Sequence, residues 1–197
     1  REIEDLGLEI DIAFDNNDVS KLEVLLVSCD SLMENETSEN HSVLYFYKAN
    51  CYAALRMIER KDVDDTWSWH RERLVAEILN LRKAVAESGF EKLDEIIQCK
   101  ILTNIANGMS SLGRVIESIS YYEKALSRID NFAMALGNKA IGQVHYGQHL
   151  YDPGHSGIFF FHANKELNRF GSEPILWDCG IQQDALETFM GYRDFTE

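Results

Sequence analysis

The apolar and polar residues between Ile101 and Phe132 follow the period of an α-helix. In the first half of this stretch, apolar or small side chains recur on one face at Leu102, Ala106 and Met109. Gly113 interrupts the run, and the same spacing resumes in Ser118, Tyr122 and Ala125. The stretch therefore predicts two antiparallel helices joined by a turn at Gly113, with the small Ala106 allowing a close approach of the second helix.

Residues 3–33 carry the same pattern at a constant offset of 96 residues. The matching positions are Leu6, Ile10, Ala13, Asn17, Leu22, Leu26 and Cys29. Asn17 takes the place of Gly113, and asparagine also tolerates the left-handed conformation of a turn. Asp18 or Ser20 can cap the helix that follows. We therefore expect a helical hairpin at about residues 3–33, followed by a polar loop from Met33 to Asn40.

Two more hairpins follow from the same spacing, at about residues 41–88 and 132–170. The first is longer than the others, and we expect residues 60–66 to form an exposed tip between two extended helices. The second begins with Leu136, Ala140 and Val144 and continues, after a loop at 147–157, with Phe160 and Ala163. An amphipathic helix at 175–193 is placed to cover the hydrophobic end of the array.

The Ile101–Phe132 stretch resembles one tetratricopeptide (TPR) repeat, a helical hairpin of about 34 residues with the cues L-G/A…Y…A…F/Y…A. Met109 stands where tyrosine is usual in that pattern, and Asp130 where proline is usual. The resemblance implies an all-α, TPR-like α-solenoid of antiparallel helical hairpins. We expect residues 1–197 to form a single such array, with hairpins at about 3–33, 41–88, 91–130 and 132–170. Because the chain starts at Arg1 without a methionine, we also expect it to be a fragment of a longer protein.

The net charge of −14 is concentrated near the N-terminus. Residues 1–40 hold twelve Asp or Glu residues against Arg1 and Lys21, which accounts for −10 of the total. Such a field repels nucleic-acid phosphates and attracts basic segments of a protein or peptide partner. No apolar run approaches the ~20 residues needed to span a bilayer. We therefore expect no direct contact with nucleic acid or membrane.

The four cysteines lie far apart and form no C-x-x-C pair, at Cys29, Cys51, Cys99 and Cys179. Each falls within a helical pattern, which is typical of reduced, buried thiols in a cytoplasmic protein.

Potential metal ligands are densest in the last third of the chain, at His145, His149, Asp152, His155, His162 and Cys179. His145 and His149 are spaced i, i+4, as zinc ligands on a helix are. Tyr146 replaces the glutamate of an H-E-x-x-H motif, and Asp152-Pro153-Gly154 indicates a turn. Capping and loop hydrogen bonds are therefore the preferred interpretation, with a metal hydrolase as an alternative. Because no phosphate-binding or nucleophile motif occurs either, we expect no cofactor and no catalysis within these residues.

In TPR arrays the first helix of each hairpin lines a concave groove that binds peptides. The resemblance places these residues in such a groove: Asp11, Asp15, Phe46, Asn50, Thr103, Asn104, Asn107, Met134, Asn138, Ile141 and His145. Asparagine suits a groove because its amide can pair with both the donors and the acceptors of a peptide backbone. Of Trp67 and Trp69, one is expected to be exposed as a partner contact, and Trp69 is our candidate. The alternative is that these are ordinary packing or solvated positions.

The carboxylate clamp of chaperone-binding TPR proteins is not reproduced. Asn50 and Asn104 match two of its asparagines, but Phe46, Met134 and Asn138 stand where the cations should be. The remaining hypothesis is a protein- or peptide-binding scaffold or regulatory module. The alternative is a sensor module of a larger effector enzyme, such as a nuclease of a bacterial defence or stress system, whose catalytic domain lies outside this chain.

Overall fold

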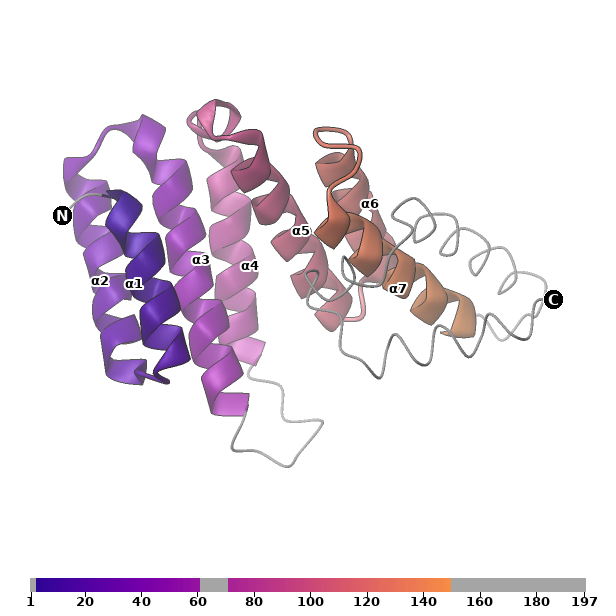
Figure 1. Ribbon diagram of the computed structural model, residues 1–197, viewed down its shortest axis with the longest axis horizontal. Coiled ribbons are helices and arrows are strands. Elements are labelled where there is room, and N and C mark those ends of the chain that lie inside the picture. Colours follow the sequence, from indigo (N-terminus) through magenta and orange to yellow (C-terminus); the bar gives the residue numbers. More distant parts are fainter. Residues whose placement is uncertain (1–2, 61–70, 150–197) are drawn as a thin grey trace. The chain divides into compact units, whose positions relative to one another are not determined.

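A computed structural model describes residues 3–60 and 71–149 (Figure 1). These residues form seven α-helices and one short 3-10 helix, each packed mainly against its neighbours in sequence. The all-α prediction is confirmed for this part of the chain. The helices group into two compact units, Arg1–Asp94 and Glu95–Glu197, which we describe one at a time. The finer prediction, a single solenoid of hairpins, stays a prediction.

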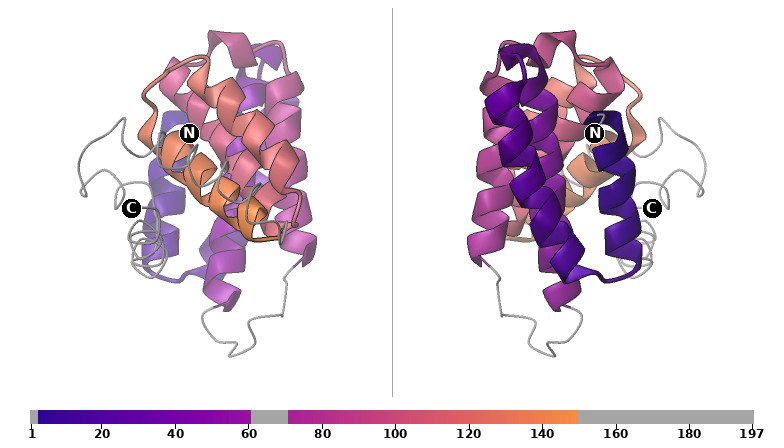
Figure 2. Two further views of the ribbon diagram at one scale, coloured as in Figure 1. Left: turned by 90° about the vertical axis from the view of Figure 1, so that its right-hand side faces the viewer. Right: turned by 90° about the vertical axis from the view of Figure 1, so that its left-hand side faces the viewer.

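The first unit contains four α-helices and the short 3-10 helix. They are α1 (Ile3–Asp15), α2 (Val19–Asn35), α3 (Ser38–Arg60), α4 (Arg71–Ala86) and η1 (Phe90–Lys92). The right-hand view of Figure 2 looks onto α1 and α2, which both pack against α3. Their shared core consists of fully or almost fully buried side chains: Leu6, Ile10, Ala13, Leu22, Leu25, Cys29, Leu44, Cys51, Ala54, Leu55 and Ile58.

Helices α3 and α4 are antiparallel, because a residue near the start of α3 contacts the end of α4, whereas a residue near the end of α3 contacts an earlier position on α4. The buried Ser42 hydroxyl donates to the carbonyl oxygen of Ala84 at 2.8 Å, and Arg56 pairs with Glu77 further along. Gly89 follows α4 and lies against the first turn of α3. A Cβ atom on Gly89 would come within 1.9 Å of the Glu39 carbonyl oxygen, so this backbone contact requires glycine.

The second unit contains α5 (Glu95–Ser111), α6 (Val115–Leu126) and α7 (Ala133–His149). Helices α5 and α6 are antiparallel: the Cys99 thiol near the start of α5 donates to the Ala125 carbonyl near the end of α6, at 3.3 Å. Ala106 and Ala125 are both fully buried, as the sequence pattern requires. Helix α7 packs against α6 and also contacts α5. All three helices therefore meet in one small bundle.

The two short turns, between α1 and α2 and between α5 and α6, have the same geometry. Asn17 has φ 53° and Gly113 has φ 76°, both in the left-handed region. The next residue donates its N–H five residues back in each case, from Asp18 to Ala13 and from Arg114 to Met109. This hydrogen-bond pattern is the Schellman motif. The predicted equivalence of Asn17 and Gly113 is therefore confirmed, and the Asp18 carboxylate caps α2 by accepting from the Lys21 N–H at 2.9 Å.

Two predicted boundaries were wrong. The expected loop from Met33 to Asn40 is mostly helical, because α2 continues to Asn35 and α3 begins at Ser38. Side-chain amides support these ends: Asn35 donates to the Ser31 carbonyl and Asn40 to the Glu36 carboxylate, both at 2.7 Å. The first helix of the hairpin placed at about 91–130 begins at Glu95, after η1 buries Phe90. The predicted tip at 60–66 lies outside the described residues except for Arg60, which ends α3. Trp67, Trp69 and the elements expected beyond residue 149 also lie outside them.

Candidate functional site

Two polar side chains of the second unit, from α6 and α7, converge on Asn107 of α5. Its Oδ1 atom accepts a hydrogen bond from the Tyr122 hydroxyl of α6 at 2.7 Å. The same oxygen accepts from Nδ2 of Asn138 on α7 at 2.9 Å. One asparagine side chain thus joins the three described helices of the unit. Asn107 and Asn138, both predicted from the sequence as partner contacts, lie directly against each other.

Tyr122 anchors this network from the bundle interior. Its side chain is only 2% exposed, and burial raises the pKa of its phenol well above the ordinary value. The phenol therefore stays protonated near neutral pH and remains a hydrogen-bond donor to Asn107. Because the Asn107 oxygen has two donors aimed at it, the orientation of its amide plane is defined by α6 and α7 together.

The hydrogen bonds within the bundle leave part of the amide chemistry unused. Among the described residues, Nδ2 of Asn107 and Oδ1 of Asn138 make no hydrogen bond with the protein. Asn104 lies three residues before Asn107 on α5, is half-buried and also makes none. Residues at i and i+3 are neighbours on a helix surface. We call Asn104, Asn107 and Asn138 the amide face of the second unit.

Two further polar atoms of the same unit are buried and have no partner among the described residues. They are Oε1 of Gln143 on α7 and Oγ1 of Thr103 on α5. Gln143 is 7% exposed and Thr103 is fully buried. A buried acceptor without a donor costs free energy, on the order of 1–3 kcal/mol, so such atoms are uncommon in folded proteins.

Charge contributes little at the amide face. Lys139 of α7 is buried beside Asn138, and its ammonium lies 3.8 Å from the carboxylate of Glu123 on α6. The acids predicted as partner contacts are in the first unit: Asp11 and Asp15 are both exposed on α1. These exposed acids therefore lie in the first unit, and the amide face lies in the second.

The remaining predicted contacts are placed less favourably. Phe46 on α3 is only 6% exposed, so little of its side chain is available to a partner. Asn50 is half-buried one turn later on the same helix. His145 lies in α7, but its side chain falls outside the described residues, as does all of Trp69.

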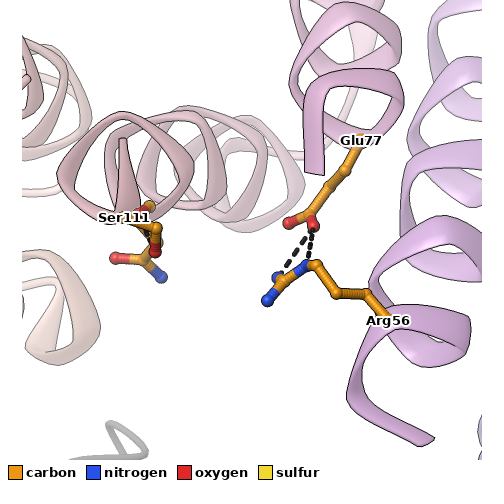
Figure 3. Close-up of polar contacts among 4 residues, drawn as sticks. Arg56, Glu77 and Ser111 are labelled. Atoms are coloured by element: carbon orange, nitrogen blue, oxygen red, sulfur yellow. Dashed lines mark hydrogen bonds and ion pairs between the residues drawn. The ribbon is translucent and has the colours of Figure 1, made fainter. Parts of the chain in front are cut away.

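The sequence analysis missed an ion pair in the first unit, between Arg56 of α3 and Glu77 of α4 (Figure 3). One Glu77 carboxylate oxygen accepts from Nε and Nη2 of Arg56, at 3.1 and 2.8 Å. Burial raises the pKa of Glu77, and the neighbouring guanidinium only partly opposes that effect. The available signal was a glutamate among the apolar positions of a helix, next to Ile78 and one turn from Leu74 and Leu81. Figure 3 also shows Ser111, whose hydroxyl donates to the Asn107 backbone carbonyl at 3.0 Å.

The described cysteines carry no evident reactivity. Cys29, Cys51 and Cys99 are buried thiols, and burial raises the pKa of Cys51 to about 12. A thiol with so high a pKa is a poor nucleophile and a poor metal ligand near neutral pH. No group of three or more His, Cys, Asp or Glu residues that could hold a metal ion occurs in the described ranges. His155, His162 and Cys179, from the alternative metal hypothesis, lie beyond them.

Within residues 3–60 and 71–149, none of the helices combines the length and the apolar character needed to cross a bilayer. Comparison of the chain with protein-family models, curated proteins and solved structures finds no match.

Proposed function

We propose that this chain is a protein- or peptide-binding module that holds an extended segment of its partner against the amide face of α5 and α7. The observation that carries this proposal is the hydrogen bond between Asn107 and Asn138. It sets two amides side by side and leaves a donor on one and an acceptor on the other. A peptide backbone presents the same pair of groups at every residue.

The amide face suits a backbone better than it suits a charged or apolar ligand. Its unused groups are neutral, and the nearby Lys139 ammonium is occupied by its approach to Glu123. A ligand carbonyl can accept from Asn107 Nδ2, while a ligand N–H donates to Asn138 Oδ1. Because the Asn107 amide is already oriented by Tyr122, binding loses little side-chain entropy there.

The wider architecture in this proposal is a TPR-like array that uses the first helix of each hairpin. The identical turns at Asn17 and Gly113 support it, since they indicate that two hairpins follow one structural rule. The acids of the first unit extend the proposal to a partner with a basic segment. Exposed acids such as Asp11 and Asp15 would mainly accelerate encounter, because exposed charge pairs add little affinity.

The test is selection of binding peptides from a random library against the intact chain, followed by affinity measurement on two variants. Asn104→Ala removes an amide that has no role in the described hydrogen bonds. Asn107→Asp keeps an oxygen for Tyr122 and Asn138 but replaces the free Nδ2 donor. At about 1 kcal/mol per hydrogen bond, each change should weaken binding roughly fivefold, and both together about thirtyfold.

Asn131→Ala is the matched control, because Asn131 is exposed in the turn before α7 and lies outside the amide face. Its affinity for the selected peptides should equal that of the parent chain. The proposal fails if selection yields no binding peptide. It also fails if every selected peptide binds the two amide-face variants as tightly as it binds the parent.

A further inference from the structure

The helix α2 has an apolar outer face in addition to the face that it buries. Leu22, Leu25 and Cys29 are in the core of the first unit. On the opposite side, Val24 is 57% exposed and Val27 is 66% exposed. Ser20, Val24, Val27 and Ser31 follow one another at intervals of four, three and four residues, which places them along a single helical stripe.

A shallow, open depression of about 650 Å³ lies over this stripe. Its apolar lining comes from Val24, Val27 and Leu32, and its polar lining includes Ser20, Ser28 and Ser31. We call these six residues the α2 outer face. The Ser28 hydroxyl donates to the Val24 carbonyl oxygen at 3.0 Å, so its donor is already used within the helix. The face is therefore less polar than its serine content suggests.

Solvent alone does not explain this composition. The exposed face of a surface helix is ordinarily built from long charged side chains, which are good helix formers and stay hydrated. Valine is a weaker helix former and gains nothing from exposure to water. Two exposed valines one turn apart, over a hollow, are instead the pattern by which a helix surface receives a second helix.

The charges beside the face select the kind of helix that fits. Glu23, Asp30 and Glu34 of α2 are exposed, and Glu23 contributes directly to the depression. The Asp30 carboxylate already pairs with the Lys48 ammonium of α3 at 2.5 Å, so Glu23 and Glu34 carry most of the attraction for a basic helix. Lys21 provides the single positive side chain of α2, and its ammonium is 2.8 Å from the Glu9 carboxylate of α1. A second copy of this chain would bring the same acids together, which opposes self-association through this face.

We propose that the α2 outer face binds an amphipathic helix of a partner protein. The apolar side chains of that helix cover Val24 and Val27, and its flanking Lys or Arg side chains face the acids of α2. This site lies in the first unit and takes a helical ligand. It is therefore independent of the amide face, which takes an extended segment.

The test uses the intact chain and a synthetic helical peptide of about 18 residues, or five turns. Leucines cover one face of this peptide, and lysines flank that face. A second peptide has glutamate at every lysine position. The lysine peptide should bind the chain, and the glutamate peptide should bind at least about tenfold more weakly.

Val24→Lys with Val27→Lys should abolish binding of the lysine peptide. The matched control is Ile96→Lys with Ile116→Lys, which adds the same charge at two exposed isoleucines of the second unit. The control should retain most of the affinity. An equal loss in the control would show that the reduced net charge alone weakens binding. If the lysine pair unfolds the chain, Val24→Ser with Val27→Ser replaces it and should weaken binding at least about fivefold.

Several results would overturn this inference. They are no binding of the lysine peptide, equal binding of the glutamate peptide, or an equal loss in the control pair. The chain could also form a dimer that dissociates when Val24 and Val27 are substituted. That result would assign the α2 outer face to a second copy and would overturn the inference. Asn104→Ala should leave this binding unchanged, so the two proposed sites can fail separately.

Discussion

Gly113→Ala should destabilise the chain through backbone conformation alone. Gly113 has φ 76°, and a Cβ atom added there would meet nothing within 4 Å. The cost is therefore that of placing an L-residue in the left-handed region, about 1–2 kcal/mol, without a steric clash. In a chain of this length, such a change lowers the melting temperature by roughly 2–4 °C per kcal/mol.

Gly142→Ala is the matched control, because Gly142 lies inside α7 and its added Cβ would be in ordinary contact with Ser118 at 3.9 Å. Alanine is favoured over glycine in a helix interior by about 0.8–1 kcal/mol, so this variant should be as stable as the parent or more stable. Thermal unfolding followed by circular dichroism compares the two. Equal melting temperatures for Gly113→Ala and Gly142→Ala would refute the assigned turn.

Three further substitutions test other contacts. Gly89→Ala should lower the free energy of unfolding in urea by about 1–3 kcal/mol, because the added Cβ would collide with the Glu39 carbonyl. An unchanged urea midpoint would contradict that close contact. Tyr122→Phe should cost about 0.5–1.5 kcal/mol in urea unfolding by leaving Asn107 with one donor, and no cost would contradict the bond. Because the pKa of Glu77 is raised on folding, the folded chain binds its proton more tightly. The stability of the parent relative to Glu77→Gln should thus rise as pH falls from 7 and level off below the ordinary glutamate pKa of 4.5. If the parent lost stability relative to Glu77→Gln over that range, the pKa of Glu77 would be lowered on folding, contrary to this prediction.

Much of the helical framework could be predicted from spacing, because amphipathic period and turn residues are local properties. The sequence offset of 96 residues predicted that Asn17 is equivalent to Gly113, and both adopt the left-handed conformation. The loop predicted from Met33 to Asn40 was wrong because that prediction also used only local polarity. Polar residues occur both in loops and on the exposed ends of helices, and here the side-chain amides of Asn35 and Asn40 stabilise helix ends.

The candidate site could be predicted only in part. The resemblance to TPR repeats placed Asn107 and Asn138 in one groove, but their direct hydrogen bond depends on how closely α5 and α7 approach. Likewise, Glu77 occurs among the apolar positions of α4, but nothing local indicates Arg56, 21 residues away, as its partner. Phe46 was assigned to a binding surface by family position, whereas its surroundings bury it.

The most direct test of the proposed function is the NMR spectrum of the asparagine side-chain amides of the intact chain, recorded with and without a selected peptide. We expect the NH₂ signals of Asn104, Asn107 and Asn138 to shift on binding. The signal of the exposed residue Asn131 should stay in place. Peptide binding that shifts other residues and leaves the three amide-face signals unchanged would contradict the proposed function.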